Sequence, residues 1–106
     1  MEEDKYANAM KIIMYAGNAK SEAMLAMDGA AEGDFAGAAS HLELARNEMR
    51  AAHKVQFDLV RAEANGEGVE VHVVLVHAQD HLTMAIMSID FAERVIDLYK
   101  KLSEKE

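Results

Sequence analysis

The residues best suited to chemistry are two histidines and an aspartate within five positions, in the segment Leu75-Val76-His77-Ala78-Gln79-Asp80-His81-Leu82. On a helix that turns about 100° per residue, Asp80 lies about 60° to one side of His77 and His81 about 40° to the other. The two imidazoles and the carboxylate would then share one face. A neutral imidazole is a nucleophile near neutral pH, so His77 can accept a phosphoryl group. His81 and Gln79 can donate hydrogen bonds to its oxygens.

Other interpretations of these residues stay open from the spacing alone. His77 and His81 can be ordinary core or interface histidines, in a bundle that only self-associates. Histidines at i and i+4 are also typical of zinc sites, so a non-catalytic helical-bundle metal-binding protein using His77, Asp80 and His81 is the alternative function. The chain has no glycine-rich phosphate loop, so we expect no nucleotide cofactor and a protein as phosphoryl donor.

The elements that must position these residues are predicted to be helices. Proline is absent and aromatic residues make up 6% of the 106 residues, a composition that favours long helices over a sheet. Cysteine is absent too, which excludes disulfides, thiol nucleophiles and cysteine-ligated zinc. Two breaks divide the chain, at Glu32-Gly33-Asp34-Phe35 and at Asn65-Gly66-Glu67-Gly68. Gly33 can end one helix and Asp34 can cap the next. We predict one all-α domain over residues 1–106, an antiparallel three-helix bundle.

The start of the third segment is ambiguous between strand and helix. Residues 69–76 are rich in valine and alternate in part, which is typical of a strand. A single strand would have no partner in an otherwise helical chain, and apolar spacing of three and four continues to Leu102. The sequence therefore favours a helix here.

Apolar spacing indicates which helix faces are buried. The first segment carries a stripe of small residues: Ala9, Ile12, Ala16, Ala19, Ala23, Ala26 and Ala30. Gly17 lies beside it and costs a helix about 1 kcal/mol relative to alanine, a hint that something packs or binds there. In the third segment we expect the bundle to be contacted by Val74, Ala78, His81, Ala85, Ser88, Ala92, Val95, Tyr99 and Leu102.

The third segment has a second apolar stripe, formed by Met84, Met87, Phe91 and Leu98 in line with His77 and Asp80. A three-helix bundle needs only one apolar stripe from each helix, so the second is predicted to meet another copy of the chain. Asp80 carboxylates would approach one another around the symmetry axis. A divalent cation bound by Asp80, Mg²⁺ as the first choice, would neutralise their repulsion.

Composition limits the partners and the compartment. The formal net charge of −8 disfavours binding to nucleic acid or to an anionic membrane surface. No apolar run approaches the ~20 residues of a membrane span, so we expect no direct membrane insertion. The acidic start, Met1-Glu2-Glu3-Asp4-Lys5, does not look like a signal peptide, and the default location is cytoplasmic.

The string from Leu75 to Leu82 resembles the active-site signature of the lactose/cellobiose-type IIA component of the phosphoenolpyruvate-dependent sugar phosphotransferase system. Three further segments resemble motifs of that family: Gly17-Asn18-Ala19-Lys20-Ser21, Gly33-Asp34-Phe35 and Ala52-His53-Lys54-Val55-Gln56. The resemblance covers nearly the whole chain. Thr83-Met84 departs from it, because the family often has the two residues in the reverse order.

The resemblance implies a homotrimer of three-helix protomers. It implies that His77 accepts a phosphoryl group from the phosphocarrier protein HPr and passes it to a cysteine of a cognate IIB component, coupled to sugar uptake. It places Asp80 on the threefold axis, where it can hold a divalent metal. It also implies that the first-helix motif helps to complete the site. Lactose, cellobiose and chitobiose are all compatible sugars.

Overall fold

Three long helices make up nearly all of the protein in the computed structural model, which describes residues 2–105. They are α1 (Glu2–Ala31), α2 (Phe35–Ala64) and α3 (Val73–Glu104). No strand occurs within the described part of the chain. The predicted all-α, three-helix class is therefore confirmed.

The α1–α2 turn forms where the sequence predicted it. Gly33 has φ of 83°, in the left-handed region that glycine adopts without a steric penalty. The Asp34 carboxylate then accepts a hydrogen bond from the Gly37 amide at 2.9 Å. It thereby caps α2 by satisfying one of the amides that a helix leaves unpaired at its start. This tight turn makes α1 and α2 antiparallel neighbours.

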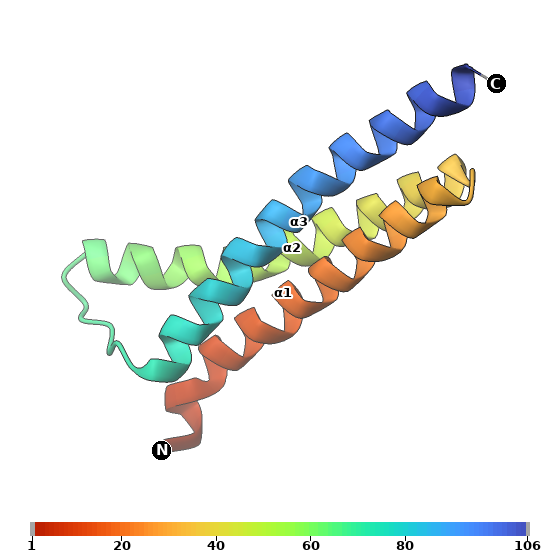
Figure 1. Ribbon diagram of the computed structural model, residues 1–106. Coiled ribbons are helices and arrows are strands. Elements are labelled where there is room, and N and C mark those ends of the chain that lie inside the picture. The colour runs from red at the N-terminus through yellow and green to blue at the C-terminus, as the bar shows by residue number, and fades with distance from the viewer. Residues whose placement is uncertain (1, 106) are drawn as a thin grey trace.

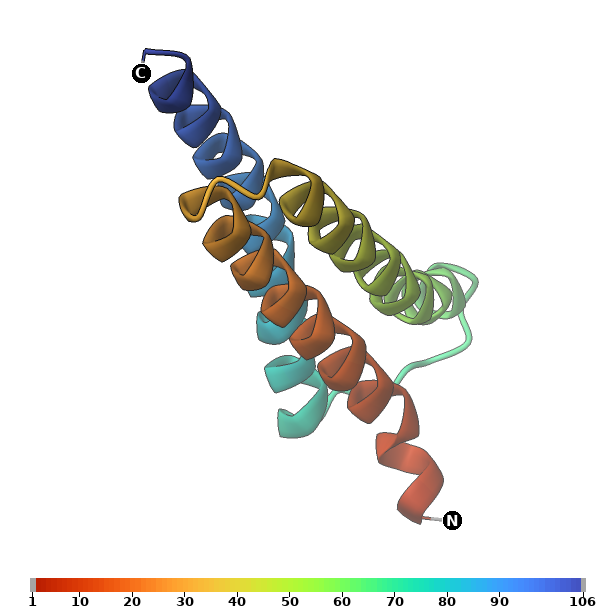
Figure 2. The ribbon, with the colours of Figure 1, turned by 90° about the vertical axis from the view of Figure 1, so that its right-hand side faces the viewer.

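The helices lie side by side in a rod of 59 × 24 × 19 Å. α1 and α3 run in the same direction and α2 is antiparallel to both, so that the two chain termini lie at opposite ends of the rod (Figures 1 and 2). α1 packs closely against both other helices, whereas α2 and α3 meet less closely. A groove between α1 and α3 is lined in part by His81, one of the two histidines identified in the sequence.

The core is built on the small residues of α1. All members of the predicted stripe are at most 2% exposed: Ala9, Ile12, Ala16, Ala19, Ala23, Ala26 and Ala30. Short side chains let two helices approach one helix closely, and their methyl groups contact Ala38, Leu42, Ala45 and Ala52 of α2. The prediction for the buried face of α1 is confirmed.

The buried face of α3 differs from the expected one by about one residue position. Its core residues are Leu75, Ala78, Leu82, Ala85, Ile89, Ala92 and Ile96. The expected alanines are buried, but His81, Ser88 and Val95 lie half-buried at the edge and Tyr99 and Leu102 are exposed. Leucine and isoleucine bury more apolar area than histidine or serine, so rotating the helix toward them is favourable.

The α2–α3 connection is neither strand nor helix at residues 67–72, so the helical interpretation was wrong for Val69–His72 and right from Val73 onward. His72 is extended, and its Nδ1 accepts a hydrogen bond from the Leu75 amide at 3.1 Å, which caps α3. The connection is also tied to α1 by an ion pair of 2.9 Å between Lys5 Nζ and Glu70 Oε1. The Lys5 hydrogen bond lowers the pKa of Glu70, and the same bond raises the pKa of Lys5.

Within residues 2–105, none of the three helices is both long enough and apolar enough to cross a bilayer.

Candidate functional site

His77 and His81 lie one turn apart on α3 and their rings are in contact. The two Nε2 atoms are 3.0 Å apart, and the rings meet edge to face with centroids separated by 4.4 Å. His77 is exposed to solvent and His81 is half-buried. Because both belong to the regular part of a long helix, the backbone fixes their separation. The two imidazoles share one face of α3, as the spacing predicted, and their rings are in contact.

The hydrogen bond between the rings has a chemical consequence. Only one of the two Nε2 atoms can carry the shared proton, and the other must present its lone pair. When His81 is the donor, the His77 Nε2 holds a lone pair at an exposed position. That lone pair accepts the His81 hydrogen bond, so nucleophilic attack by His77 requires the bond to open, after which the His81 N–H can donate to the group transferred.

A groove between α1 and α3 opens next to this pair. It has a volume of about 530 Å³ and is lined by His81 and by Gly17, Lys20, Ser21, Met24 and Leu25 of α1. Among the described residues, a Cβ added to Gly17 would meet no atom of another element within 4 Å, so the space above this glycine is open. Gly17 thus lines an open groove, which agrees with the expectation that something packs or binds at this position. In the sequence, Lys20 and Ser21 stand out only as part of the first-helix motif that resembles the family.

Gln79 is not part of the histidine pair in the single chain. Its Oε1 accepts a hydrogen bond of 3.3 Å from Gln56 Nε2, which directs the side chain toward α2. On a helix, Gln79 lies about 160° from both His81 and His77, so the separation follows from its position. A contact between Gln79 and a phosphoryl group on His77 of the same chain is therefore not supported by this arrangement.

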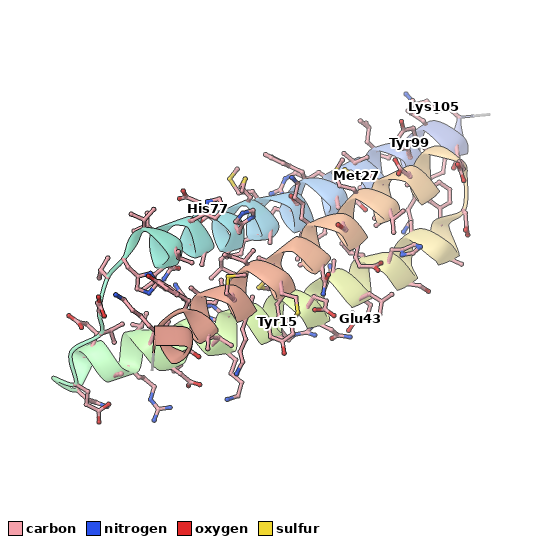
Figure 3. The ribbon with its side chains drawn as sticks, turned by 90° about the horizontal axis from the view of Figure 1, so that it is seen from below. Tyr15, Met27, Glu43, His77, Tyr99 and Lys105 are labelled. Atoms are coloured by element: carbon pink, nitrogen blue, oxygen red, sulfur yellow. The ribbon has the colours of Figure 1, made fainter. Side chains whose placement is uncertain are left out.

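Asp80 is exposed and lies within the second apolar stripe of α3. Large side chains along that stripe are also exposed, with Met84 at 43%, Met87 at 49%, Phe91 at 55% and Leu98 at 58%. Figure 3, seen from below, shows α1 between α2 and α3, with His77 on the side of α3 away from α2. The stripe thus points away from the protomer's core, as the sequence predicted, and leaves an unusually apolar surface around one carboxylate.

Comparison with known proteins identifies the family. Residues 7–100 match the family model described as "PTS system, Lactose/Cellobiose specific IIA subunit". The chain belongs to this family. It is 39% identical to the lichenan-specific phosphotransferase enzyme IIA component of Bacillus subtilis, over 99% of this chain and 96% of that protein. It is 41% identical to the cellobiose-specific EIIA component of Lactococcus lactis, over 97% of each.

Solved structures agree with the helical arrangement. A crystal structure of the cellobiose-specific enzyme IIA from Bacillus anthracis superposes with a TM-score of 0.93 at 40% identity, over 96% of this chain and 94% of that one. The structure of PtcA from S. mutans superposes with a TM-score of 0.89 at 33% identity, over 94% of this chain and 98% of that one. The chain is thus a sugar-specific IIA component of the phosphotransferase system, a family of phosphoryl carriers.

Potential metal ligands do not cluster among the described side chains of a single chain. Within residues 5–105, no three histidine, aspartate or glutamate side chains are placed to hold an ion together. Within one chain, Asp80 is therefore not placed to join His77 and His81 as the third ligand that the metal-binding alternative requires. A single Asp80 carboxylate fits a metal site only if other copies of this IIA chain supply further carboxylates.

The remaining histidines lie elsewhere in this IIA chain. His41 Nδ1 is 2.6 Å from Glu22 Oε2, in a contact between α2 and α1. His53 is exposed on α2, with its ring centroid 6.3 Å from that of Phe57. His72 caps α3 and contacts the Tyr6 ring edge to face. These side chains have structural partners of their own, which leaves His77 and His81 as the paired imidazoles.

Proposed function

We propose that His77 is the phosphoryl-accepting residue of this IIA component, taking the group from phospho-HPr and passing it to a cysteine of the cognate IIB component. The observation that carries the proposal is the exposed His77 ring, held on a long helix with His81 Nε2 at 3.0 Å. Family membership supports the type of reaction. A donor and an acceptor of this kind also imply a cytoplasmic location.

The transfer can be written with balanced bonds. The lone pair of His77 Nε2 attacks the phosphorus of phospho-HPr, an N–P bond forms, and the P–N bond to the HPr imidazole breaks with its electron pair returning to that ring. The incoming group displaces the hydrogen bond between His77 and His81, and the His81 N–H then donates to a phosphoryl oxygen. In the second step a IIB thiolate attacks the phosphorus, and the electron pair of the N–P bond returns to His77. Both steps depend mainly on positioning and charge stabilisation.

The proposal includes assembly into a homotrimer through the exposed stripe of α3. The apolar stripe supports it, because large exposed apolar side chains in a row are typical of contact surfaces between chains. Asp80 lies in the same stripe, so copies that pack there bring carboxylates together. A divalent cation such as Mg²⁺, bound by Asp80 from each copy, would offset their repulsion. In such an assembly Gln79 remains a candidate for contact with the site of a neighbouring chain.

Transfer of ³²P from phosphoenolpyruvate through enzyme I and HPr tests the role of His77. We expect one acid-labile phosphoryl group per chain in the wild type and none in His77→Gln. His53→Gln is the matched control, because it also removes an exposed imidazole but leaves the pair on α3 intact. Labelling of His77→Gln at the wild-type level would show that another residue carries the group.

A further inference from the structure

The groove beside the histidine pair contains a cation that the proposed transfer does not yet use. Lys20 of α1 lines the groove together with His81. Its neighbour Ser21 lines the same groove and is also exposed. The two residues belong to a different helix from the histidines, so the α1–α3 packing brings Lys20 and Ser21 to the groove beside His81, whose ring contacts that of His77. The remaining lining is Gly17, Met24 and Leu25, which contributes no charge.

Lys20 is not committed to an ion pair within the described residues. Several other cations are paired: Lys5 with Glu70, Arg46 with Glu93, Arg50 with Glu43 and Lys54 with Asp58. Within residues 5–105, Lys20 has no carboxylate within 4.0 Å, and neither has Lys11, so what distinguishes Lys20 is its place in the groove beside His81. An unpaired ammonium in an acidic protein is available to an anion from outside.

Ser21 shows a similar availability. The hydroxyls of Thr83, Ser88 and Ser103 each donate to a carbonyl of their own helix. Over the described side chains, no such bond is formed by the Ser21 hydroxyl. A hydroxyl and an ammonium on successive residues can both donate to the oxygens of one phosphoryl group.

We propose that Lys20, assisted by Ser21, contacts the phosphoryl group carried on His77 and stabilises its negative charge from the α1 side of the groove. The inference rests on the proposed function, because it needs a phosphoryl group on His77. A phosphoryl group adds negative charge to a chain whose formal net charge is already −8, so a nearby cation lowers the cost of accepting it. Apolar Met24 and Leu25 beside Lys20 reduce the screening of that attraction by water.

Variants at Lys20 separate charge from shape. Lys20→Met removes the charge and keeps a long side chain, Lys20→Arg keeps the charge, and Lys11→Met is the control, because Lys11 is exposed on α1 but outside the groove. The readouts are the rate of phosphoryl acceptance from phospho-HPr and the rate at which the isolated phosphoprotein hydrolyses. For Lys20→Met we expect about tenfold slower acceptance, the effect of losing one charge-assisted hydrogen bond at a partly exposed site. Hydrolysis should also change, and Lys20→Arg and Lys11→Met should stay near wild type.

The outcomes distinguish this inference from the proposed function. Failure of the wild type to be phosphorylated on His77 would overturn both. Normal phosphorylation of the wild type together with identical rates for Lys20→Met and Lys11→Met would overturn the role of Lys20 alone. Sedimentation velocity on each variant supplies the second check, since a slower rate accompanied by loss of assembly would assign Lys20 to an interface and refute the phosphoryl contact.

Discussion

Gly17 is predicted to be a position where an added methyl group stabilises the chain and impairs its function. The glycine is helical, its φ is not in the left-handed region, and a Cβ would meet no atom within 4 Å. Gly17→Ala should therefore gain the helix propensity of alanine, about 1 kcal/mol in the free energy of unfolding. For a domain of this size that corresponds to a rise of about 4–8 °C in Tm.

Gly29 provides the comparison, because it lies on the same helix but in a close contact. A Cβ there would be 3.3 Å from the Ala38 amide nitrogen and 3.4 Å from the Asp34 carbonyl oxygen, both of which are backbone atoms that cannot rotate away. The same propensity gain is then offset by an overpacking cost of about 1–3 kcal/mol. Gly29→Ala should be less stable than Gly17→Ala by roughly that cost, since the propensity terms cancel.

Urea unfolding followed by circular dichroism, at one fixed protein concentration, measures the free energy of unfolding of both variants. The phosphotransfer assay measures how fast each variant accepts the phosphoryl group, which tests the use of the groove. Gly17→Ala should accept the phosphoryl group more slowly although it is more stable, because its methyl group narrows the groove that contains His81. Equal stabilisation by the two alanines would refute the close α1–α2 contact at Gly29. A stabilised Gly17→Ala with wild-type transfer would refute the use of the groove.

Three further perturbations test the fold and the assembly. Asp34→Ala should lower the free energy of unfolding by about 1 kcal/mol in urea, because the α2 cap is lost, whereas Asp34→Asn should stay close to wild type. Lys5→Met should return the lowered pKa of Glu70 toward its ordinary value in an NMR titration. In the wild type, the support that this ion pair gives to the connection is present above that ordinary value and disappears as the pH falls through the lowered pKa. Asp80→Leu should keep or tighten the assembly in sedimentation velocity, since a cluster of like charges is removed.

Much of the fold could be predicted because its signals are local. The alternation of three and four along the alanines of α1 identifies a helix face without reference to any other element. Gly33 and Asp34 combine the two residue types that end one helix and begin another. Such features depend on a few neighbouring residues, and the structure reproduces them at the expected positions.

The register of α3 was harder to predict because alanines fit two neighbouring stripes. Ala78, Ala85 and Ala92 belong both to the expected stripe and to the observed one, so their spacing does not decide the rotation of the helix. The decision comes from the packing against α1, where Leu82 and Ile89 are buried in place of His81 and Ser88. That rotation also moves His81 to the edge of the bundle, where it lines the groove.

In the candidate site, contacts within one helix could be predicted from the sequence, whereas contacts between two helices could not. The contact between His77 and His81 follows from a spacing of four on one helix, and it could be expected as soon as α3 was taken as helical. The neighbourhood of Lys20 and the hydrogen bond of Gln79 with Gln56 depend on how two helices are rotated against each other. No pattern within one segment contains that information, so these contacts required the structure.

Assembly and phosphoryl transfer are predicted to be coupled, because the apolar stripe and the histidine pair occupy adjoining parts of α3. Met84 lies about 20° from His77 around the helix and Phe91 about 40°, so a chain that covers the stripe also approaches the His77 ring. Phe91→Asp places a charge in the exposed stripe and should dissociate the assembly while the core residues of α3 stay buried. The dissociated chain should accept the phosphoryl group more slowly than wild type, and dilution of the wild type should lower acceptance per chain in parallel with its sedimentation coefficient. A monomeric Phe91→Asp that is phosphorylated at the wild-type rate would show that one protomer contains the complete site.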